Sequence, residues 1–389
     1  MKLCAISFKP CWQDDAGHWV SDGGFPLQMV WISTLFDEMT LVITGGAPGG
    51  GGLSLPRHAK VVPLRFPEGS SFQRKLTVLR NIFYYVRAIA PHVREADVVH
   101  VPLPGDLPFI GMLLALAYRK RLIVRYGSSW VPTAQSTSMT NLTKALMRWF
   151  AGGRNVMLAT GDAHAPPAPG MSWIFSTAIT KAELREIPSV IDRGVQDPPQ
   201  IAFIGRLSGE KGLPNLIDAV YHMKQRGDTP LPRVTLIGSG PDGALLQAYV
   251  ASQGLQEVIR FTGQLNREAL SDTLRKCDFC VQPSLTEGFS KAWLDAFAHG
   301  LPVLASDVGA AGAVVGGNGE RGWLVPPGNV RALEEQLHRI MTGSLDWAGI
   351  RQRCREYTER RTLEVWAEEI GRICARQWGI RLEGGKLRA

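Results

Sequence analysis

The chain has 389 residues, of which 45% are hydrophobic, and its formal net charge is +8 at pH 7. It is too long for one ordinary hydrophobic core and has the composition of a soluble globular protein of two domains. The positive charge favours an anionic partner. The cations are spread along the chain, with no run that would make a nucleic-acid-binding arm, and an ordinarily solvated surface is the alternative.

The cysteines and the apolar runs indicate the compartment. Cys277 and Cys280 form the one close pair among six cysteines, and no second such pair or histidine pair completes a zinc set, so we expect reduced core cysteines. The apolar run between Lys2 and Lys9 is too short for a signal peptide, and the longest run, residues 107–118, is too short to span a bilayer. The sequence thus predicts a cytoplasmic location.

Short apolar runs alternate with longer amphipathic stretches, which is typical of βαβ units and parallel sheets. In the first half the predicted strands are residues 2–8, 39–44, 59–63, 97–101, 121–125 and 155–159. The predicted helices there are residues 25–36, 72–94, 107–118 and 141–150. The Gly-rich run 45–52 lacks a strand-to-helix context and is interpreted as a flexible loop.

A Pro-rich zone precedes a second regular series that starts at Gln200. Its predicted strands are residues 201–204, 233–237, 258–261, 279–282, 302–305 and 323–325, and its helices 213–225, 244–253, 267–275 and 289–299. The tail 346–378 is predicted to be wholly helical, with Trp366 and Trp378 on an apolar side that packs back on the first domain. We therefore predict an α/β protein with two doubly wound, Rossmann-like domains that face a cleft. The expected boundaries are 1–192, 193–360 and a returning C-terminal helix and tail at 361–389.

A Gly-bounded loop, Gly205 to Gly212, joins a predicted strand to a predicted helix. A helix N-terminus presents N–H groups and partial positive charge, so anions bind there. Arg206 can fork onto phosphate oxygens and Lys211 adds a point charge, which predicts a diphosphate site. A surface ion pair with Glu210 is the alternative that the local spacing leaves open.

Two carboxylates separated by seven residues, Glu287 and Asp295, follow the strand that ends at Pro283-Ser284. In a helix, eight steps span about 12 Å, the reach from a sugar ring across a diphosphate to a ribose. Glu287 would then accept hydrogen bonds from sugar hydroxyls and Asp295 from ribose hydroxyls, while N–H groups at the helix start hold the phosphates. A helix-capping Glu287 with a solvated Asp295 is the alternative.

Four motifs occur in one order: Gly205-Arg206-Leu207 with Lys211-Gly212, Gly238-Ser239-Gly240-Pro241, Pro283-Ser284 with Glu287-Gly288-Phe289, and Gly300-Leu301-Pro302-Val303. With them, residues 200–342 resemble the nucleotide-sugar domain of the retaining GT-B glycosyltransferases (family 4, glycosyl transferases group 1). The resemblance implies catalytic roles for Arg206, Lys211 and Glu287. The donor-binding residues that it implies are Gly23, Gly24, Gly205, Gly238, Gly240, Ser284, Gly288, Phe289, Ser290, Lys291 and Asp295, where Asp295 replaces the family's Glu.

The first domain resembles the family more loosely. Asp22-Gly23-Gly24 before a helix matches its N-terminal glycine loop, but the family's usual His is replaced by the run that begins at Arg125-Tyr126, and its Asn-Gly-Val segment is missing. The acceptor side is accordingly expected around His100, Arg125 and Tyr126, with a structural role as the alternative for His100.

The resemblance implies a retaining, hexosyltransferase-type enzyme that transfers a sugar from a nucleotide-diphosphate sugar to an acceptor hydroxyl, in cell-surface polysaccharide or glycolipid synthesis. No Asp-x-Asp motif ends a strand, so we expect no metal and no cofactor. A non-catalytic homologue that binds nucleotide or glycan, and a GT-B epimerase or phosphorylase, are the alternatives. The run 238–243 also fits a dinucleotide fingerprint, but the next strand ends without an acidic residue, which argues against a dehydrogenase.

The expected partners are a nucleotide-sugar donor and a glycan or lipid-linked acceptor, with no nucleic acid. The predicted helices 72–94 and 141–150 interleave Arg and Lys with aromatic residues, which suits peripheral contact with an anionic membrane at its inner face. Ordinary amphipathic helices with their aromatics in the core are the alternative.

Overall fold

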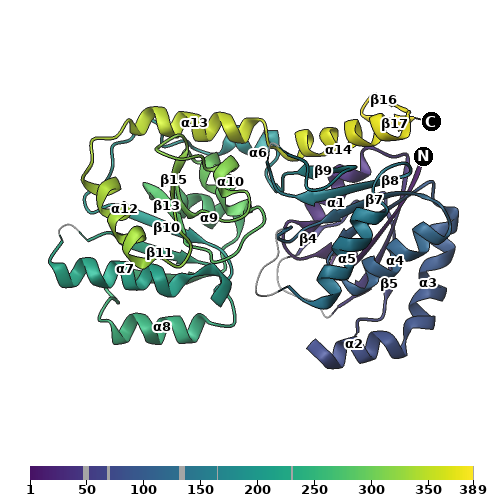
Figure 1. Ribbon diagram of the computed structural model, residues 1–389, viewed down its shortest axis with the longest axis horizontal. Coiled ribbons are helices and arrows are strands. Elements are labelled where there is room, and N and C mark those ends of the chain that lie inside the picture. The colour runs from purple at the N-terminus through teal and green to yellow at the C-terminus, as the bar shows by residue number, and fades with distance from the viewer. Residues whose placement is uncertain (47–51, 68–70, 131–135, 164, 229–230, 389) are drawn as a thin grey trace. The chain divides into compact units, whose positions relative to one another are not determined.

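The structure is a computed structural model, and it describes residues 1–46, 52–67, 71–130, 136–163, 165–228 and 231–388 (Figure 1). Its contacts divide the chain into two compact units. Unit 1 consists of Met1–Ala178 together with Leu363–Ala389, and unit 2 of Ile179–Thr362. The domain boundaries expected at residues 192 and 360 stay a prediction.

Unit 1 is built on a nine-stranded sheet in which seven strands run parallel, in the order β5-β3-β1-β6-β7-β8-β9. β2 pairs antiparallel with the end of β1, and β4 pairs antiparallel with β2. The strands are β1 (Lys2–Gln13), β2 (Trp19–Ser21), β3 (Glu38–Gly45), β4 (Leu53–Ser54), β5 (Lys60–Leu64), β6 (Val98–Leu103), β7 (Arg121–Tyr126), β8 (Asn155–Thr160) and β9 (Met171–Ile174). The strand order reverses between β1 and β6, as in a doubly wound sheet.

Helices cover both faces of this sheet. The helices are α1 (Phe25–Ser33), α2 (Ser71–Arg80), α3 (Ile82–Glu95), α4 (Asp106–Ala117), α5 (Ser138–Trp149) and α14 (Leu363–Trp378). Ile89 of α3, Ile110 of α4 and Met147 of α5 share one apolar core with the sheet. On the other face, α1 and α14 share a second core, to which Trp366 contributes a fully buried ring. A hairpin of β16 (Arg381–Glu383) and β17 (Lys386–Arg388) follows α14.

Unit 2 is built on a six-stranded, all-parallel sheet in the order β12-β11-β10-β13-β14-β15. Its strands are β10 (Gln200–Ile204), β11 (Arg233–Ile237), β12 (Ile259–Gly263), β13 (Phe279–Gln282), β14 (Val303–Ser306) and β15 (Gly322–Val325). Phe203, Val281 and Leu304 are fully buried, because helices on both faces exclude water from a parallel sheet. The strand order reverses between β10 and β13.

The helices of unit 2 are α6 (Lys181–Glu186), η1 (Gly209–Lys211), α7 (Leu213–Arg226), α8 (Gly243–Ser252), α9 (Arg267–Leu274), α10 (Lys291–Ala298), α11 (Ala311–Val314), α12 (Val330–Thr342) and α13 (Trp347–Glu359). α6 begins with a capping box in which Thr180 and Glu183 each bond the other's backbone N–H. α7 packs against α12, and α10 against α13.

The predicted doubly wound α/β architecture is confirmed, and each predicted strand is present within a few residues. Two predicted helices are divided in the structure, and a third starts later at the candidate site. The run 72–94 is two helices that break at Asn81, the tail is two helices that break at residues 360–362, and the helix predicted from residue 289 begins at Lys291. Most of the predicted Gly-rich loop, residues 47–51, lies outside the described residues. Among the described residues, no helix is both long and apolar enough to cross a bilayer.

Candidate functional site

The loops that leave the carboxyl ends of β10 and β13 adjoin where the strand order of unit 2 reverses. Ligands of doubly wound sheets bind at this position, because the two neighbouring loops diverge and leave a crevice. Backbone hydrogen bonds tie the loops of unit 2 together: Leu207 N–H donates to Ser239 O (3.0 Å), Leu285 N–H to Glu210 O (2.8 Å) and Ala310 N–H to Gly288 O (2.9 Å). The loops therefore form one connected scaffold.

Glycines allow these loops to approach so closely. Gly212 has φ +63°, and a Cβ at this position would lie 2.1 Å from the carbonyl oxygen of Pro283. A Cβ at Gly238 would meet the carbonyl oxygen of Gly205, and one at Gly240 that of Leu207. Backbone lies against backbone at each point, and no side chain fits there.

Lys211 and Glu287 form an ion pair between the β10 and β13 loops. Both side chains are largely buried, with 17% and 16% of their surfaces exposed. The neighbouring Glu210 accepts a hydrogen bond from Ser208 Oγ (2.7 Å). Lys211 thus pairs across to the next loop, and this places a cation and a carboxylate together at the switch point.

Arg206 adds a second cation to this loop. Its side chain is exposed, unlike that of Lys211. Burial acts to raise the pKa of Glu210, but its hydrogen bonds and the charges of Lys211 and Arg206 outweigh burial and lower the pKa. Glu210 therefore stays ionised within electrostatic reach of both cations.

Asp295 lies in α10, which begins at Lys291 after the N-cap residue Ser290. The chain from Glu287 to Ser290 is irregular, so the spacing of about 12 Å expected from helical rise does not describe the two carboxylates. Burial raises the pKa of Asp295 to about 6, although the charges of Arg267 and Lys291 oppose it. This carboxylate therefore titrates close to neutral pH.

The remaining donor-side residues predicted in unit 2 lie in the same loops. Ser284, Phe289 and Ser290 are buried, and the Phe289 ring contacts that of Trp293 with 5.9 Å between centroids. They shape the β13–α10 loop, and Lys291 is the first residue of the helix that follows.

Sequence reasoning missed the residues that support the two carboxylates. Gly309 has φ +59°, and a Cβ there would lie 2.1 Å from the carbonyl oxygen of Glu287. Glu183, which acts to raise the pKa of Asp295, pairs with Arg267 across 3.0 Å. A glycine four residues after a predicted strand is a recognisable turn signal, whereas a contact between α6 and α9 leaves no local pattern.

The predicted acceptor-side residues lie inside unit 1. His100 is fully buried with its Nδ1 3.2 Å from the carbonyl oxygen of Ile123, and burial together with the charge of Arg125 lowers its pKa to about 3. Arg125 donates to Gln28 Oε1 (2.8 Å), and burial lowers its pKa to about 10. Tyr126 is buried as well, so none of these three side chains offers much surface to an acceptor. Their direct contact with an acceptor stays a prediction.

The glycine loop of unit 1 lies at the start of α1. Gly23 has φ +70° and nothing near its Cβ position, and Gly24 is the N-cap residue of the helix. Gly23 is therefore required by the turn and not by packing.

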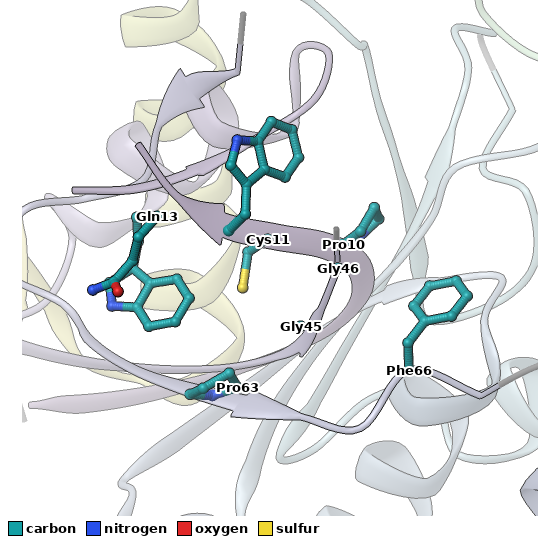
Figure 2. Close-up of a pocket in the computed structure, with 9 residues that line it drawn as sticks. Pro10, Cys11, Gln13, Gly45, Gly46, Pro63 and Phe66 are labelled. Atoms are coloured by element: carbon teal, nitrogen blue, oxygen red, sulfur yellow. The ribbon is translucent and has the colours of Figure 1, made fainter. Parts of the chain in front are cut away.

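Unit 1 also contains an aromatic hollow of about 690 Å³ at the ends of β1, β3 and β5 (Figure 2). Its walls include Trp12, Trp19 and Phe66, with Gln13 as a polar group, and burial raises the pKa of the Cys11 thiol to about 11. Apolar walls with few polar groups are typical of small-ligand sites. Within the described residues, no group of three or more His, Cys, Asp or Glu side chains is placed to hold a metal ion.

Comparisons with known proteins agree with this geometry. Residues 191–361 match the family model described as glycosyl transferases group 1. The chain is 34% identical over 190 residues to a D-inositol 3-phosphate glycosyltransferase of Jonesia denitrificans (48% of this chain, 41% of the relative). It is 30% identical over 198 residues to an MMP alpha-(1->4)-mannosyltransferase of Mycolicibacterium hassiacum (49% and 46%). The matched region thus spans less than half the length of these curated relatives.

Solved structures cover nearly the whole chain. Sucrose-phosphate synthase from Thermosynechococcus elongatus superposes with a TM-score of 0.73 at 18% identity, covering 97% of this chain and 99% of that one. HepE of Anabaena in complex with UDP-glucose gives a TM-score of 0.68 at 18% identity, covering 97% and 100%. These likenesses show the GT-B fold. Over residues 191–361, the chain is similar to the glycosyl transferases group 1 family.

Proposed function

We propose that the protein is a retaining glycosyltransferase that transfers a sugar from a nucleotide-diphosphate sugar to an acceptor hydroxyl. The observation that carries the proposal is the Lys211–Glu287 ion pair, which joins two loops at the switch point of the unit 2 sheet. A diphosphate needs cations and N–H groups, and a sugar needs a carboxylate acceptor for its hydroxyls. This place offers both.

The donor diphosphate would lie against Arg206, Lys211 and the N–H groups at the start of α10. Arg206 offers an exposed fork of N–H donors, and Lys211 a point charge held in place by Glu287. The Ser290 side chain does not cap the N-terminus of α10, so the free N–H groups there and their partial positive charge can act on the phosphates. HepE, which shares the fold, binds UDP-glucose, and a UDP-sugar is the donor that we assign.

Asp295 would bind the ribose. A carboxylate accepts two hydrogen bonds from neighbouring hydroxyls, and Asp295 lies one turn into the helix whose start would hold the phosphates. Glu287 would bind hydroxyls of the transferred sugar once the donor's phosphates draw Lys211 towards themselves.

In the reaction, the bond between the anomeric carbon and the diphosphate oxygen breaks, and the acceptor oxygen bonds to the anomeric carbon on the same face. The proton of the acceptor hydroxyl passes to the departing diphosphate. Negative charge grows on that leaving group, and Arg206, Lys211 and the α10 N–H groups stabilise it from fixed positions. We assign this charge stabilisation to these residues without a metal or other cofactor.

The acceptor would be a sugar hydroxyl of a cell-surface glycan or glycolipid, held by unit 1. The aromatic hollow offers accessible surface for the apolar face of a sugar ring, whereas Arg125 and His100 are buried below the surface. We place the enzyme in the cytoplasm, at the inner face of the membrane that carries such acceptors.

A thermal-shift screen tests the donor site. UDP, GDP, ADP, CMP, dTDP and their sugars would be added to the wild type, to Arg206→Ala and to Glu287→Gln. We expect one nucleoside diphosphate to raise the melting temperature through binding to the folded state, and Arg206→Ala to reduce its affinity about tenfold. Arg331→Ala is the matched control, since Arg331 is an exposed unit 2 arginine on α12.

Turnover separates an enzyme from a binding protein. Release of nucleoside diphosphate from the stabilising sugar nucleotide should fall at least a hundredfold in Glu287→Gln, whose fold and nucleotide affinity persist. Nucleotide binding without any turnover of the wild type would identify a non-catalytic homologue. Stabilisation by NAD alone would overturn the donor site.

A further inference from the structure

The outward side of the helix layer α2–α5 in unit 1 has an unusual composition. α3, α4 and α5 pack through one shared core on the same face of the nine-stranded sheet, so their opposite sides point away from it (Figure 1). Nine of the thirteen exposed large hydrophobic side chains among the described residues lie on α2–α5 or directly after α5. Exposed apolar residues scattered evenly over the surface are ordinary. Their concentration on one helix layer calls for an explanation.

The exposed apolar residues form a stripe on α5 and flank the break between α2 and α3. Leu79 near the end of α2 and Phe83 near the start of α3 lie on either side of the break at Asn81 and are 67% and 84% exposed. On α5, Met139, Leu142 and Trp149 are spaced by three and seven residues, and Trp149 is 84% exposed. The spacing on α5 puts its three exposed residues on one side of that helix, away from the buried Met147.

The helices α2–α5 contain many basic residues and almost no acidic ones. α2–α5 contain seven Arg or Lys and two acidic residues, whereas the whole chain has 43 and 35. The two acidic residues, Glu95 and Asp106, lie at the last position of α3 and the first of α4. Arg80, the last residue of α2, and Arg87 of α3 are exposed, and Arg87 lies about one turn from Phe83 along α3.

We propose that this helix face binds the surface of an anionic phospholipid bilayer. Phe83, Leu79 and Trp149 would enter the boundary between headgroups and acyl chains, while Arg80 and Arg87 would contact the lipid phosphates. The near absence of acidic side chains makes the face complementary to a negative leaflet. The inference deepens the proposed function by naming the surface that meets the membrane, and it stands on the side chains of unit 1 alone.

Vesicle flotation tests the proposal with the full chain and without donor or acceptor. Vesicles of phosphatidylcholine alone and of phosphatidylcholine with phosphatidylglycerol (about 7:3) would be compared at low and high salt. We expect binding to the anionic vesicles only, weakened by salt as the charges are screened. Replacing Arg80 and Arg87 by Glu should lower the affinity by at least tenfold, on the order of fivefold for each cation lost.

A matched pair of substitutions separates the helix face from general surface hydrophobicity. Leu79→Glu should lower vesicle binding several-fold, and Leu79→Glu combined with Phe83→Glu should abolish it. Leu245→Glu is the control, because Leu245 is 71% exposed but lies on α8 of unit 2. This variant should bind vesicles as the wild type does.

The proposal would be overturned by wild-type protein that floats equally with neutral vesicles or with none, or by equal losses in the Leu79 and Leu245 variants. A dimer in solution that Leu79→Glu dissociates, with no vesicle binding, would assign the face to a second copy of the chain. Because no nucleotide is present, failure here leaves the donor screen unaffected.

Discussion

A buried ion pair such as Lys211–Glu287 costs desolvation that its own attraction offsets only in part. Proteins therefore seldom gain stability from such a pair compared with apolar side chains of the same size. Here the two partners belong to different loops and stand beside the exposed Arg206 at a ligand-binding position of the fold. The pair is best explained as a preorganised cation and carboxylate whose full set of partners arrives with the donor.

We expect Asp295 to make donor affinity and stability depend on pH in opposite directions. Its pKa of about 6 in the folded state lies above that of an unfolded aspartate, near 4. Between these values the folded form holds a proton that the unfolded form has released, so this residue's contribution to stability falls as pH rises through that window. The ionised form, to which we assign ribose binding, appears over the same window.

We therefore expect nucleotide affinity to rise from pH 5 to pH 7.5 and Asp295→Asn to remove that rise. The Asn variant should also gain stability relative to wild type over this range, on the order of 2 kcal/mol. Isothermal titration calorimetry and urea unfolding at several pH values measure the two effects. Identical pH profiles for the two proteins would show that Asp295 lies outside the donor site.

At the scale of elements, the scaffold of unit 2 depends on the close approach of the β10 and β13 loops. A Cβ at Gly212 would require a backbone carbonyl to move, and the positive φ adds strain. We expect Gly212→Ala to cost about 3 kcal/mol in the free energy of unfolding and to weaken nucleotide binding. Gly227 also has a positive φ, +79°, but open space surrounds its Cβ position. Gly227→Ala should therefore lower the free energy of unfolding by only about 1 kcal/mol, from the left-handed backbone, and leave binding unchanged.

Chemical denaturation of the two variants measures their free energies of unfolding and separates the two sources of strain. Equal losses of stability would mean that φ alone matters at Gly212 and that the loops can separate without cost. A larger loss for Gly212→Ala, together with weaker binding, would support the connected scaffold.

Apolar strand patterns carried the prediction of the fold, because a strand buried on both faces is a continuous hydrophobic run. The run at β13 is one such case, with all four of its residues buried. Short elements were missed where this signal fails: β2 and β4 extend the sheet at its edge, and β9 lies in the Pro-rich zone. α12, though amphipathic, was also missed.

The candidate site was predictable where it rests on local sequence and not where it rests on tertiary contact. The glycine loop with Arg206 and Lys211 has a pattern, and so does the Glu287 segment. The start of α10 at Lys291 was not foreseen, because the tight contact of Gly309 with the Glu287 carbonyl holds the preceding residues in an irregular path. The interior position of Arg125 depends likewise on Gln28 and Trp366, which are distant in sequence.

At the scale of the whole molecule, α14 completes unit 1 although it follows unit 2 in the chain. Trp366 is fully buried against α1, and the hairpin behind it is tied to Asp37 by Lys386 (3.1 Å) and Arg388 (2.8 Å). We expect Trp366→Ala to destabilise unit 1 by about 3–5 kcal/mol through the cavity that it leaves. Trp149→Ala, which removes an exposed ring, should change stability by less than about 0.5 kcal/mol.

Hydrogen exchange read by mass spectrometry locates the effect. Amides of β1 and β3 should lose protection in Trp366→Ala, while those of β10 and β13 keep theirs. Equal loss in both sheets would show that the two units unfold as one.

The division of unit 1 between the two ends of the chain has a consequence during synthesis on the ribosome. Residues 179–362 can emerge and fold while the core that Met29 of α1 and Leu41 of β3 share still lacks α14. The order of folding is then the reverse of the order of translation: the second unit is finished first, and the nascent first unit waits, exposed to chaperones, for the last residues of the chain.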